Sequence, residues 1–229
     1  MNYLDLAKRL VIEAGISGNG PASVISQSGE MKRVVGWIAS AYEDLQLVHD
    51  DWYFLRGTFS LVTTPDKFRY TPVEAGILTP PMGESRFLGW DINSMAISNT
   101  GEANDQSLLT FISYQQYRDH YLQSVMTSSR PLIISVSPSL ELLLGDKPNR
   151  AYTITGEYYK KPQLLVNNVD VPELPPQYHM AIVYRALMMY ARFEAAGEIY
   201  QDAEMNYKRF LNKIRNNQLP TIDFAEPLV

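Results

Sequence analysis

The chain has 229 residues, and its 20 Lys and Arg stand against 25 Asp and Glu, which gives a formal net charge of -5. Because its basic residues are scattered along the chain, this acidic balance provides no global attraction to nucleic acid. The chain contains no cysteine, which excludes disulfides, thiolate nucleophiles and Cys-ligated metal sites. Arg185 interrupts the most apolar run, so no stretch reaches the roughly 18 apolar residues of a membrane span, and we expect a soluble protein.

Two amphipathic helices are predicted at the N-terminus. The first has Asn2 as its candidate N-cap, Gly15 as its candidate end, and a helical apolar stripe formed by Leu4, Ala7, Val11 and Ala14. After a Gly/Ser/Pro loop, a second helix is expected from about Ser28. We expect one side of it to be buried, which contains Met31, Val34, Val35, Ile38, Tyr42, Leu45 and Val48.

The middle of the chain, from about residue 58 to 161, predicts β-structure. Short apolar runs alternate with turn residues, which is typical of an antiparallel sheet or a small sandwich: FSLVTT, FRYT, INSMAIS, SLLTFI, LIISVS, LELLLG and YTITGEYY. One helix is expected inside this region at SYQQYRDHYLQS, because Ser113 and Gln116 match a capping box. The turn-forming composition of GDKPNR predicts a hairpin between LELLLG and AYTITGEYYK.

The C-terminal part begins with VPELPPQYHMAIVYRALMMYA, in which Pro176 suits the first turn of a helix. Apolar residues then follow a seven-residue repeat on two seams, one with Ile182, Met189, Ala196, Ala203 and Phe210, the other with Ala186, Phe193, Tyr200, Tyr207 and Ile214. Gly197 lies in the middle of this pattern. The stretch EAAGEIY therefore predicts either a kink or a tight turn between two antiparallel helices, and we favour the break.

The last segment, NNQLPTIDFAEPLV, has two prolines and no helical period. It contains four spaced apolar residues, Leu219, Ile222, Phe224 and Leu228. A solvated tail seldom carries so many large apolar side chains. The segment is thus either disordered or an extended arm that docks on its own domain or on a neighbour.

No catalytic, cofactor-binding or metal-binding constellation is apparent in the sequence. The three histidines, His49, His120 and His179, lie in three different predicted elements, and none is spaced from a second strong ligand as a metal motif requires. The glycine-rich GISGNGP follows a helix and lacks the Gly-Lys-Ser/Thr ending of a phosphate-binding loop. We therefore predict that the protein is not an enzyme and has no cofactor and no metal.

The order of these segments resembles the head-to-tail adaptor proteins of short-tailed bacteriophages. The resemblance spans nearly all of residues 1 to 220. It is carried by MNYLDLAKRLVIEAG, GISGNGP, the helix SGEMKRVVGWIASAYEDLQLVHDDWYFLR, the β-region from RPLIISVS to GEYYKKP, and the helical ELPPQYHMAIVYRAL with its downstream AEMNYKRFL. The most specific parts are Trp37 to Trp52 and the PPQYHMAIVYRAL stretch.

The resemblance implies an α+β fold, in which a helical bundle from the N- and C-terminal helices carries an inserted antiparallel β-sheet or sandwich domain. The expected boundaries are residues 1–52 for the N-terminal helices, 53–170 for the β-rich insertion with one helix, 171–215 for the C-terminal helices and 216–229 for an extended C-terminal arm.

The resemblance also implies partners and a place in the virion. Such adaptors form a homo-oligomeric ring, commonly a dodecamer, at the head-tail junction, with the portal protein above and tail or nozzle proteins below. The ring is assembled in the host cytoplasm, and double-stranded DNA passes through it passively, which suits an acidic chain. The arm with Leu219, Ile222, Phe224 and Leu228 then engages the portal or an adjacent subunit, and Tyr184 and Arg185 face a neighbouring subunit.

A second hypothesis comes from a different class of protein. In it the chain is a monomeric module whose β-domain binds a ligand or hydrolyses a cell-envelope component. It predicts a deep pocket with convergent polar groups, in which His120 or His179 meets two carboxylates.

Overall fold

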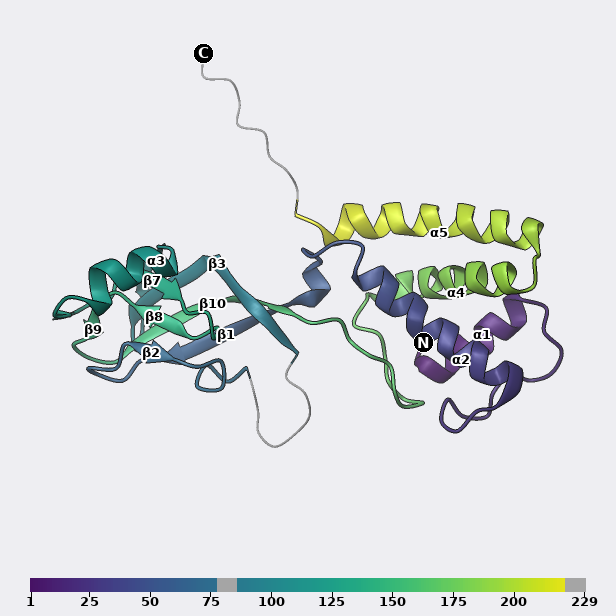
Figure 1. Cartoon of the computed structure of the whole chain (residues 1–229), viewed down its shortest axis with the longest axis horizontal. Helices are drawn as coiled ribbons and strands as arrows, with labels where there is room; N and C mark the ends of the chain where they lie inside the picture. Colours follow the sequence, from purple (N-terminus) through teal and green to yellow (C-terminus); the bar gives the residue numbers. More distant parts are fainter. Residues whose placement is uncertain (78–85, 221–229) are drawn as a thin grey trace, which may run out of the picture. The chain divides into compact units, whose positions relative to one another are not determined.

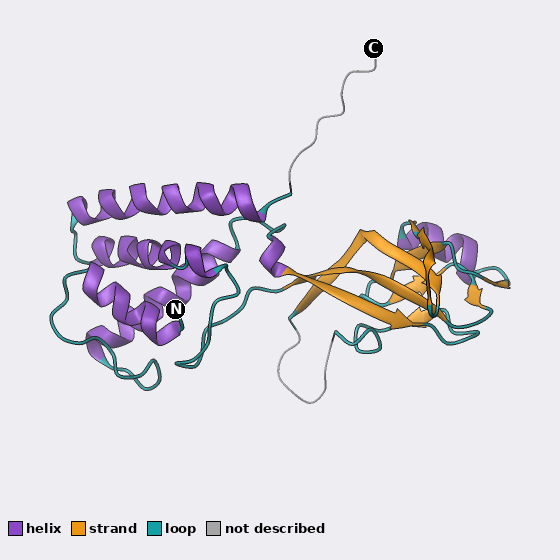
Figure 2. Cartoon of the chain, turned by 180° about the vertical axis from the view of Figure 1, so that it is seen from behind, coloured by secondary structure: helices purple, strands orange, loops and turns teal. Residues whose placement is uncertain are grey.

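The structure is a computed structural model that describes residues 1–77 and 86–220, and it has the predicted α+β composition (Figures 1 and 2). The chain divides into two compact units. We call Met1–Leu55 together with the chain from Pro162 onward the helical unit, and Arg56–Lys161 the β unit. None of the helices within the described ranges combines the length and the apolar character that a membrane crossing requires.

The helical unit is organised around α4. The helix α4 packs against α1, α2 and α5, and all four helices contribute to one apolar core. The helical elements of this unit are α1 (Tyr3–Glu13), α2 (Gly29–Gln46), the 3-10 turns η1 (Tyr53–Leu55) and η3 (Pro176–Tyr178), α4 (Met180–Phe193) and α5 (Gly197–Gln218).

The ends of α1 and α2 follow from local chemistry. The Asn2 side chain accepts a hydrogen bond from the Asp5 amide at 2.9 Å and the Asp5 carboxylate accepts one from the Asn2 amide at 3.2 Å, which confirms Asn2 as the cap. Gly15 has a φ of +65, as expected just after a helix. In α2 the predicted face is buried except at two positions: Met31 is half-buried, and Val48 is exposed because the helix ends at Gln46.

The C-terminal helical segment breaks into two antiparallel helices, which confirms the turn. Residues 194–196 form the turn, in which the Ala196 amide donates to the Ala191 carbonyl at 2.8 Å and Ala195 has a φ of +55. Gly197 begins α5 rather than ending α4. The two helices lie side by side in both views (Figures 1 and 2).

The β unit contains two four-stranded sheets that share one apolar core, which selects the sandwich from the two predicted arrangements. The first sheet is antiparallel and has the order β1 (Arg56–Val62), β10 (Tyr152–Lys160), β3 (Phe87–Asn99), β4 (Glu102–Leu108). The second has the order β2 (Arg69–Tyr70), β8 (Leu142–Leu144), β7 (Ile133–Val136), β5 (Thr110–Phe111), with β5 and β7 parallel. A short parallel pair joins β6 (Ser128–Ser129) to β9 (Lys147–Pro148).

The helix predicted at Ser113 is present as α3 (Tyr114–Tyr117), followed by a π-helical turn, η2 (Arg118–Leu122). The Ser113 and Gln116 side chains form the expected capping box. Tyr117 is buried, and its hydroxyl donates to the Leu144 carbonyl of β8 at 2.8 Å. The helix is thereby fixed to the second sheet.

The predicted hairpin between LELLLG and AYTITGEYYK is wrong. β8 pairs with β7, because the Ser137 amide donates to the Glu141 carbonyl at 2.9 Å and closes a tighter turn between those two strands. β10 pairs instead with β1 and β3 in the other sheet. The segment GDKPNR has turn-forming residues because the chain crosses there from one sheet to the other, and composition does not distinguish these two uses.

Three boundaries also differ from the sequence-based expectation, and the first is the start of the β unit, which lies at Arg56 and not at residue 53. Residues 162–170 lie in the helical unit and not in the β-rich insertion. The reason is that backbone groups of this segment bond α1: the amides of Tyr3 and Leu4 donate to the carbonyls of Asp170 and Asn168. At the other end α5 continues to Gln218, beyond the expected limit of 215.

Substitution of Gly156 tests the packing of the β unit. A Cβ at this position of β10 would lie 2.9 Å from Phe59 Cε1 and 3.1 Å from Met95 Cγ, and both side chains are buried. We expect Gly156→Ala to lower the free energy of unfolding by about 1–3 kcal/mol, measured by urea denaturation. Gly89→Ala in β3 is the matched control, since a Cβ there meets nothing within 4 Å. Equal effects of the two substitutions would contradict this packing.

Candidate partner-binding surfaces

The three histidines lie apart and each has a structural environment. His49 accepts a hydrogen bond from Arg215 Nε at 3.0 Å and packs edge-on against Trp52 with 5.0 Å between ring centroids. His120 is exposed in the π-helical turn. Within the described ranges, no group of three or more His, Asp or Glu side chains is arranged to hold a metal ion.

His179 is fully buried and makes two hydrogen bonds that define its tautomer. Its Nε2 lies 2.8 Å from the Leu174 carbonyl, to which only a protonated nitrogen donates. Its Nδ1 lies 3.0 Å from the Met1 ammonium and therefore accepts. Burial, together with the Met1 charge, lowers the pKa of His179 below its ordinary value of 6.5. The neutral ring connects the N-terminus to the start of α4.

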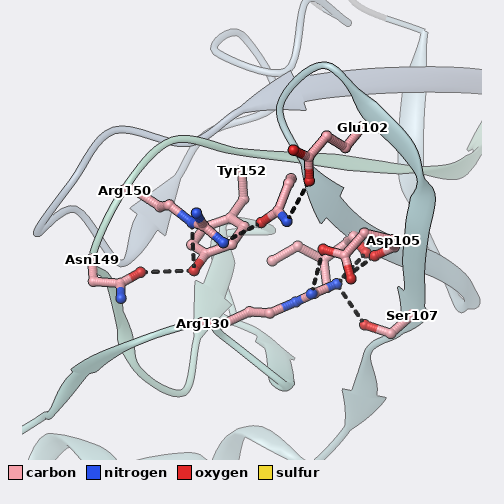
Figure 3. Close-up of polar contacts among 9 residues, drawn as sticks. Glu102, Asp105, Ser107, Arg130, Asn149, Arg150 and Tyr152 are labelled. Carbon is pink, nitrogen blue, oxygen red and sulfur yellow. Dashed lines mark hydrogen bonds and ion pairs between the residues drawn. The ribbon is translucent and has the colours of Figure 1, made fainter.

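A cluster of charged and polar side chains lies near the β3–β4 connection of the β unit (Figure 3). Its residue types resemble those of an active site, but its members form hydrogen bonds and an ion pair with one another. Arg130 donates to the Asp105 carboxylate at 2.6 Å, to the Asp105 carbonyl at 2.7 Å and to Ser107 Oγ at 3.0 Å. Beside it, Tyr152 donates to Asn149 at 2.7 Å. The hydrogen bond from Arg130 lowers the pKa of Asp105. These groups face one another and fasten the edge strand β4.

An open hollow on the β unit is lined by Pro65, Asp66, Lys67, Phe68, Arg69, Thr71, Glu74 and Glu141. Four of its five charged side chains form ion pairs within it. Lys67 bonds Glu74, which lowers the pKa of that carboxyl, and Arg69 Nη1 lies 3.5 Å from Glu141 Oε2. Neither His120 nor His179 lines this hollow, so it lacks the combination of groups that the second hypothesis predicts.

Tyr184 and Arg185 of α4 are half-buried and contact helices of their own chain. The Tyr184 ring lies 5.8 Å from the Phe210 ring of α5. Arg185 forms an ion pair with Asp44 of α2 at 2.9 Å. Only the solvent-accessible part of each side chain can therefore contact a neighbouring subunit.

The expected C-terminal arm is described only at its start. Leu219 is the C-cap of α5, has extended backbone angles and is half-buried against the helical core. Ile222, Phe224 and Leu228 lie outside the described residues.

Among the described residues of the helical unit, the most exposed group of aliphatic side chains lies on residues 162–173, which we call the apolar loop. Four aliphatic residues of this loop are largely accessible: Leu164 60%, Val166 63%, Val169 76% and Val171 52%. Between them, Leu165 is buried in the helical core. Large accessible aliphatic groups gathered in one short segment are typical of a protein-protein contact.

The apolar loop is tightly held from both sides. The Gln163 amide donates to Gln46 Oε1 at 2.7 Å, and Gln46 Nε2 donates back to the Gln163 carbonyl at 3.0 Å. The hydroxyl of Tyr42 donates to Gln163 Oε1 at 2.8 Å. The loop backbone at this end is thus fixed to α2.

The other end of the loop is fixed by its own side chains. Asp170 accepts hydrogen bonds from the amides of Asn167 and Val166, both at 2.7 Å, and these bonds lower the pKa of its carboxyl. Asn168 Oδ1 accepts from the Val24 amide at 2.6 Å. A loop with so many fixed backbone groups presents its side chains in one arrangement, which reduces the entropy lost on binding.

The sequence analysis does not predict a binding surface at the apolar loop. Its one signal is the segment QLLVNNVDV, which follows Pro162 and carries five aliphatic residues between amide and acidic ones. Four of the five are exposed and the fifth, Leu165, is buried. The segment has no helical or strand periodicity from which this difference could be predicted.

Acid destabilisation tests the environment of His179. Because its pKa is lowered in the folded state, His179 contributes stability that is complete above pH 6.5 and is lost as the pH falls toward the lowered pKa. The loss is at most about 1.4 kcal/mol per pH unit. We expect His179→Gln to remove this part of the pH dependence of the unfolding free energy, measured by urea denaturation between pH 8 and pH 5.

His120→Gln is the control for this measurement, since His120 is exposed. It is expected to leave the pH dependence unchanged. Two results would contradict the prediction: the same reduction of the pH dependence of the unfolding free energy by both substitutions, or no change of that pH dependence by His179→Gln. Either would show that the burial of His179 does not make stability depend on pH.

The sequence profile of the SU10 adaptor protein family matches residues 1–225. A search of curated proteins found no match.

Proposed function

The chain belongs to the SU10 adaptor protein family, a family of bacteriophage head-tail adaptors, and on this premise we propose that it forms a ring between the portal and the tail. As a member of that family it is a structural protein of a phage virion. The observation that carries the proposal is the extent of the match, since residues 1–225 include both the helical unit and the β unit.

The proposed assembly is a homo-oligomeric ring, expected to be a dodecamer, with the portal protein above it and tail or nozzle proteins below. Double-stranded DNA passes through its centre without being tightly held. The net charge of -5 supports this passive role, because a strongly basic channel would retain the phosphate backbone. Assembly is proposed to take place in the host cytoplasm and to end at the head-tail junction.

We assign the apolar loop to the contact between neighbouring subunits. A ring repeats one heterologous contact, and that contact benefits from a surface that is already ordered in the free subunit. The loop has this property because α1, α2 and its own Asp170 hold it. The half-exposed parts of Tyr184 and Arg185 are proposed to lie at a subunit contact as well.

The C-terminal arm, which begins at residue 219 because α5 extends to Gln218, is proposed to engage the portal. Its apolar residues Leu219, Ile222, Phe224 and Leu228 are spaced so that each occupies a separate site on a partner surface. In this arrangement the helical unit forms the wall of the ring, and the arm attaches that wall to the portal.

Truncation of the arm tests the contact with the portal. Electron microscopy of the full chain mixed with the portal ring of its phage is expected to show a ring seated on the portal. A variant that ends at Gln218 is expected to show none, because the four apolar anchors are removed. A full chain that stays monomeric and ignores the portal would contradict the proposed function.

A variant of full length separates the anchors from the length of the arm. Ile222→Ser, Phe224→Ser and Leu228→Ser together are expected to reduce seating as the truncation does. The control replaces polar residues of the same segment, Thr221→Ser, Asp223→Ser and Glu226→Ser, and is expected to seat normally.

The subunit contact is tested by Leu164→Ser together with Val169→Ser in the apolar loop. Both side chains are more than half exposed, so the folded monomer should keep its unfolding midpoint. Assembly on the portal is expected to fall at least tenfold, measured as seated rings per portal particle. Leu108→Ser with Leu132→Ser in the β unit is the control, because these side chains are also more than half exposed. Equal losses in both variants would show that the apolar loop has no special part in assembly.

A further inference from the structure

The outer face of α5 has an unusual composition along its last three turns. Its exposed residues recur at i, i+1, i+4, i+5, i+8 and i+9, which places them on one face: Lys208, Arg209, Asn212, Lys213, Asn216 and Asn217. We call this set the α5 face. Every member is a cation or an amide, and no acidic residue occurs between Met205 and Gln218. The acidic residues of α5, Glu198, Asp202 and Glu204, all precede this region.

The α5 face is accessible in the helical unit. The opposite face of the helix packs into the core through Ala203, Tyr207, Leu211 and Ile214. In both cartoon views α5 borders the helical unit, with α4 on one side and no other described element of that unit on the other (Figures 1 and 2). The side chain of Lys208 is 65% exposed although it pairs with Glu204 at 3.1 Å.

The remaining charges of the α5 face are not neutralised. Arg209 and Lys213 lie 5.6 and 6.0 Å from the centre of the Phe210 ring. Neither has a carboxylate partner among residues 1–77 and 86–220. The ring contacts orient the two cations but leave their charges available.

Ordinary helix energetics does not account for this composition. The helix dipole favours cations only in the last turn, whereas Lys208 and Arg209 lie about ten residues before the end of α5. A solvated helix face normally mixes both signs of charge, and this one has only positive charge and amides. The rest of the chain is acidic overall, which makes the face a local exception.

We propose that the α5 face binds the phosphate backbone of double-stranded DNA. Lysine, arginine and asparagine side chains are among the donors that proteins use for phosphate oxygens. The face extends over about 14 Å of helix, a length along which B-DNA presents about eight phosphate charges. This inference rests on the proposed function, in which DNA passes through the ring, and it identifies the surface that meets the DNA.

The expected interaction is weak for a single chain. Three exposed cations release about three counterions, so the binding constant should fall with the salt concentration with a logarithmic slope of about -2.7. Raising the salt from 50 to 200 mM should then weaken binding roughly 40-fold. Contacts of this strength, repeated around a ring, keep DNA centred without holding it at one position.

Nuclear magnetic resonance of the full chain tests the proposal, since it detects weak binding residue by residue. Titration of the isotope-labelled protein with a 20-base-pair duplex at 50 mM salt is expected to shift the amide signals of residues 205–218. Lys208→Gln with Arg209→Gln and Lys213→Gln is expected to weaken binding at least tenfold. The control, Lys8→Gln with Lys32→Gln and Lys161→Gln, makes the same change in net charge at other exposed positions and should bind as the original chain does.

The outcomes separate this proposal from the proposed function. Shifts centred on other elements, or equal weakening by both triple variants, would overturn the α5 assignment while seating on the portal stays intact. A triple α5 variant that binds DNA normally but no longer seats on the portal would also overturn it, because the face would then be a protein contact. Conversely, the chain could show the expected shifts of the α5 amide signals but never assemble on a portal. This result would refute the proposed ring and would still support the contact between α5 and DNA.

Discussion

β1 and β10 pair along seven positions, from Arg56 opposite Tyr159 to Val62 opposite Thr153, so the chain leaves and rejoins the helical unit at points about one strand spacing apart. Closing a loop of roughly 100 flexible residues would otherwise cost about 4 kcal/mol of chain entropy. The sandwich core of the β unit offsets this cost. Helices that are more than 100 residues apart in sequence can then meet, which is why α4 packs directly against α1 and α2.

The segment that rejoins the helical unit illustrates how the fold produces a surface. Gln46 and Gln163 exchange two hydrogen bonds, and Tyr42 adds a third, each contributing about 1 kcal/mol. These bonds order the backbone of the apolar loop without burying its aliphatic side chains. Complete burial of each of those side chains in a complex is worth about 1.5–3 kcal/mol, and the ordering has already taken place in the free subunit.

The sequence predicts features that depend on neighbouring residues. It does not predict features that depend on contacts between residues far apart in the chain. The Asn2 and Ser113 caps and the break before Gly197 follow from local hydrogen bonding and backbone conformation, and all three are confirmed. Only the last two residues of β4 fall within a predicted strand, SLLTFI, because the rest of β4 is polar and its edge is fastened by Arg130, which is distant in sequence. The prediction that residues 162–170 belong to the β insertion fails for a similar reason. The partners of this segment, Gln46 of α2 and the amides of Tyr3 and Leu4 in α1, lie more than 100 residues earlier in the sequence.

Two chemically different surfaces thus lie on different sides of the helical unit. The apolar loop bonds α1 through Tyr3 and Leu4, whereas the α5 face lies beyond α4, which packs between α1 and α5. In both cartoon views the loop and α5 occupy opposite edges of this unit (Figures 1 and 2). A subunit of a ring needs such a division, because a contact that repeats around the ring and a surface that meets the DNA cannot be the same. Because the acidic residues of α5 all lie in its first half, the unopposed positive charge of this helix lies at its C-terminal end, which suits contact with a polyanion that has to keep moving.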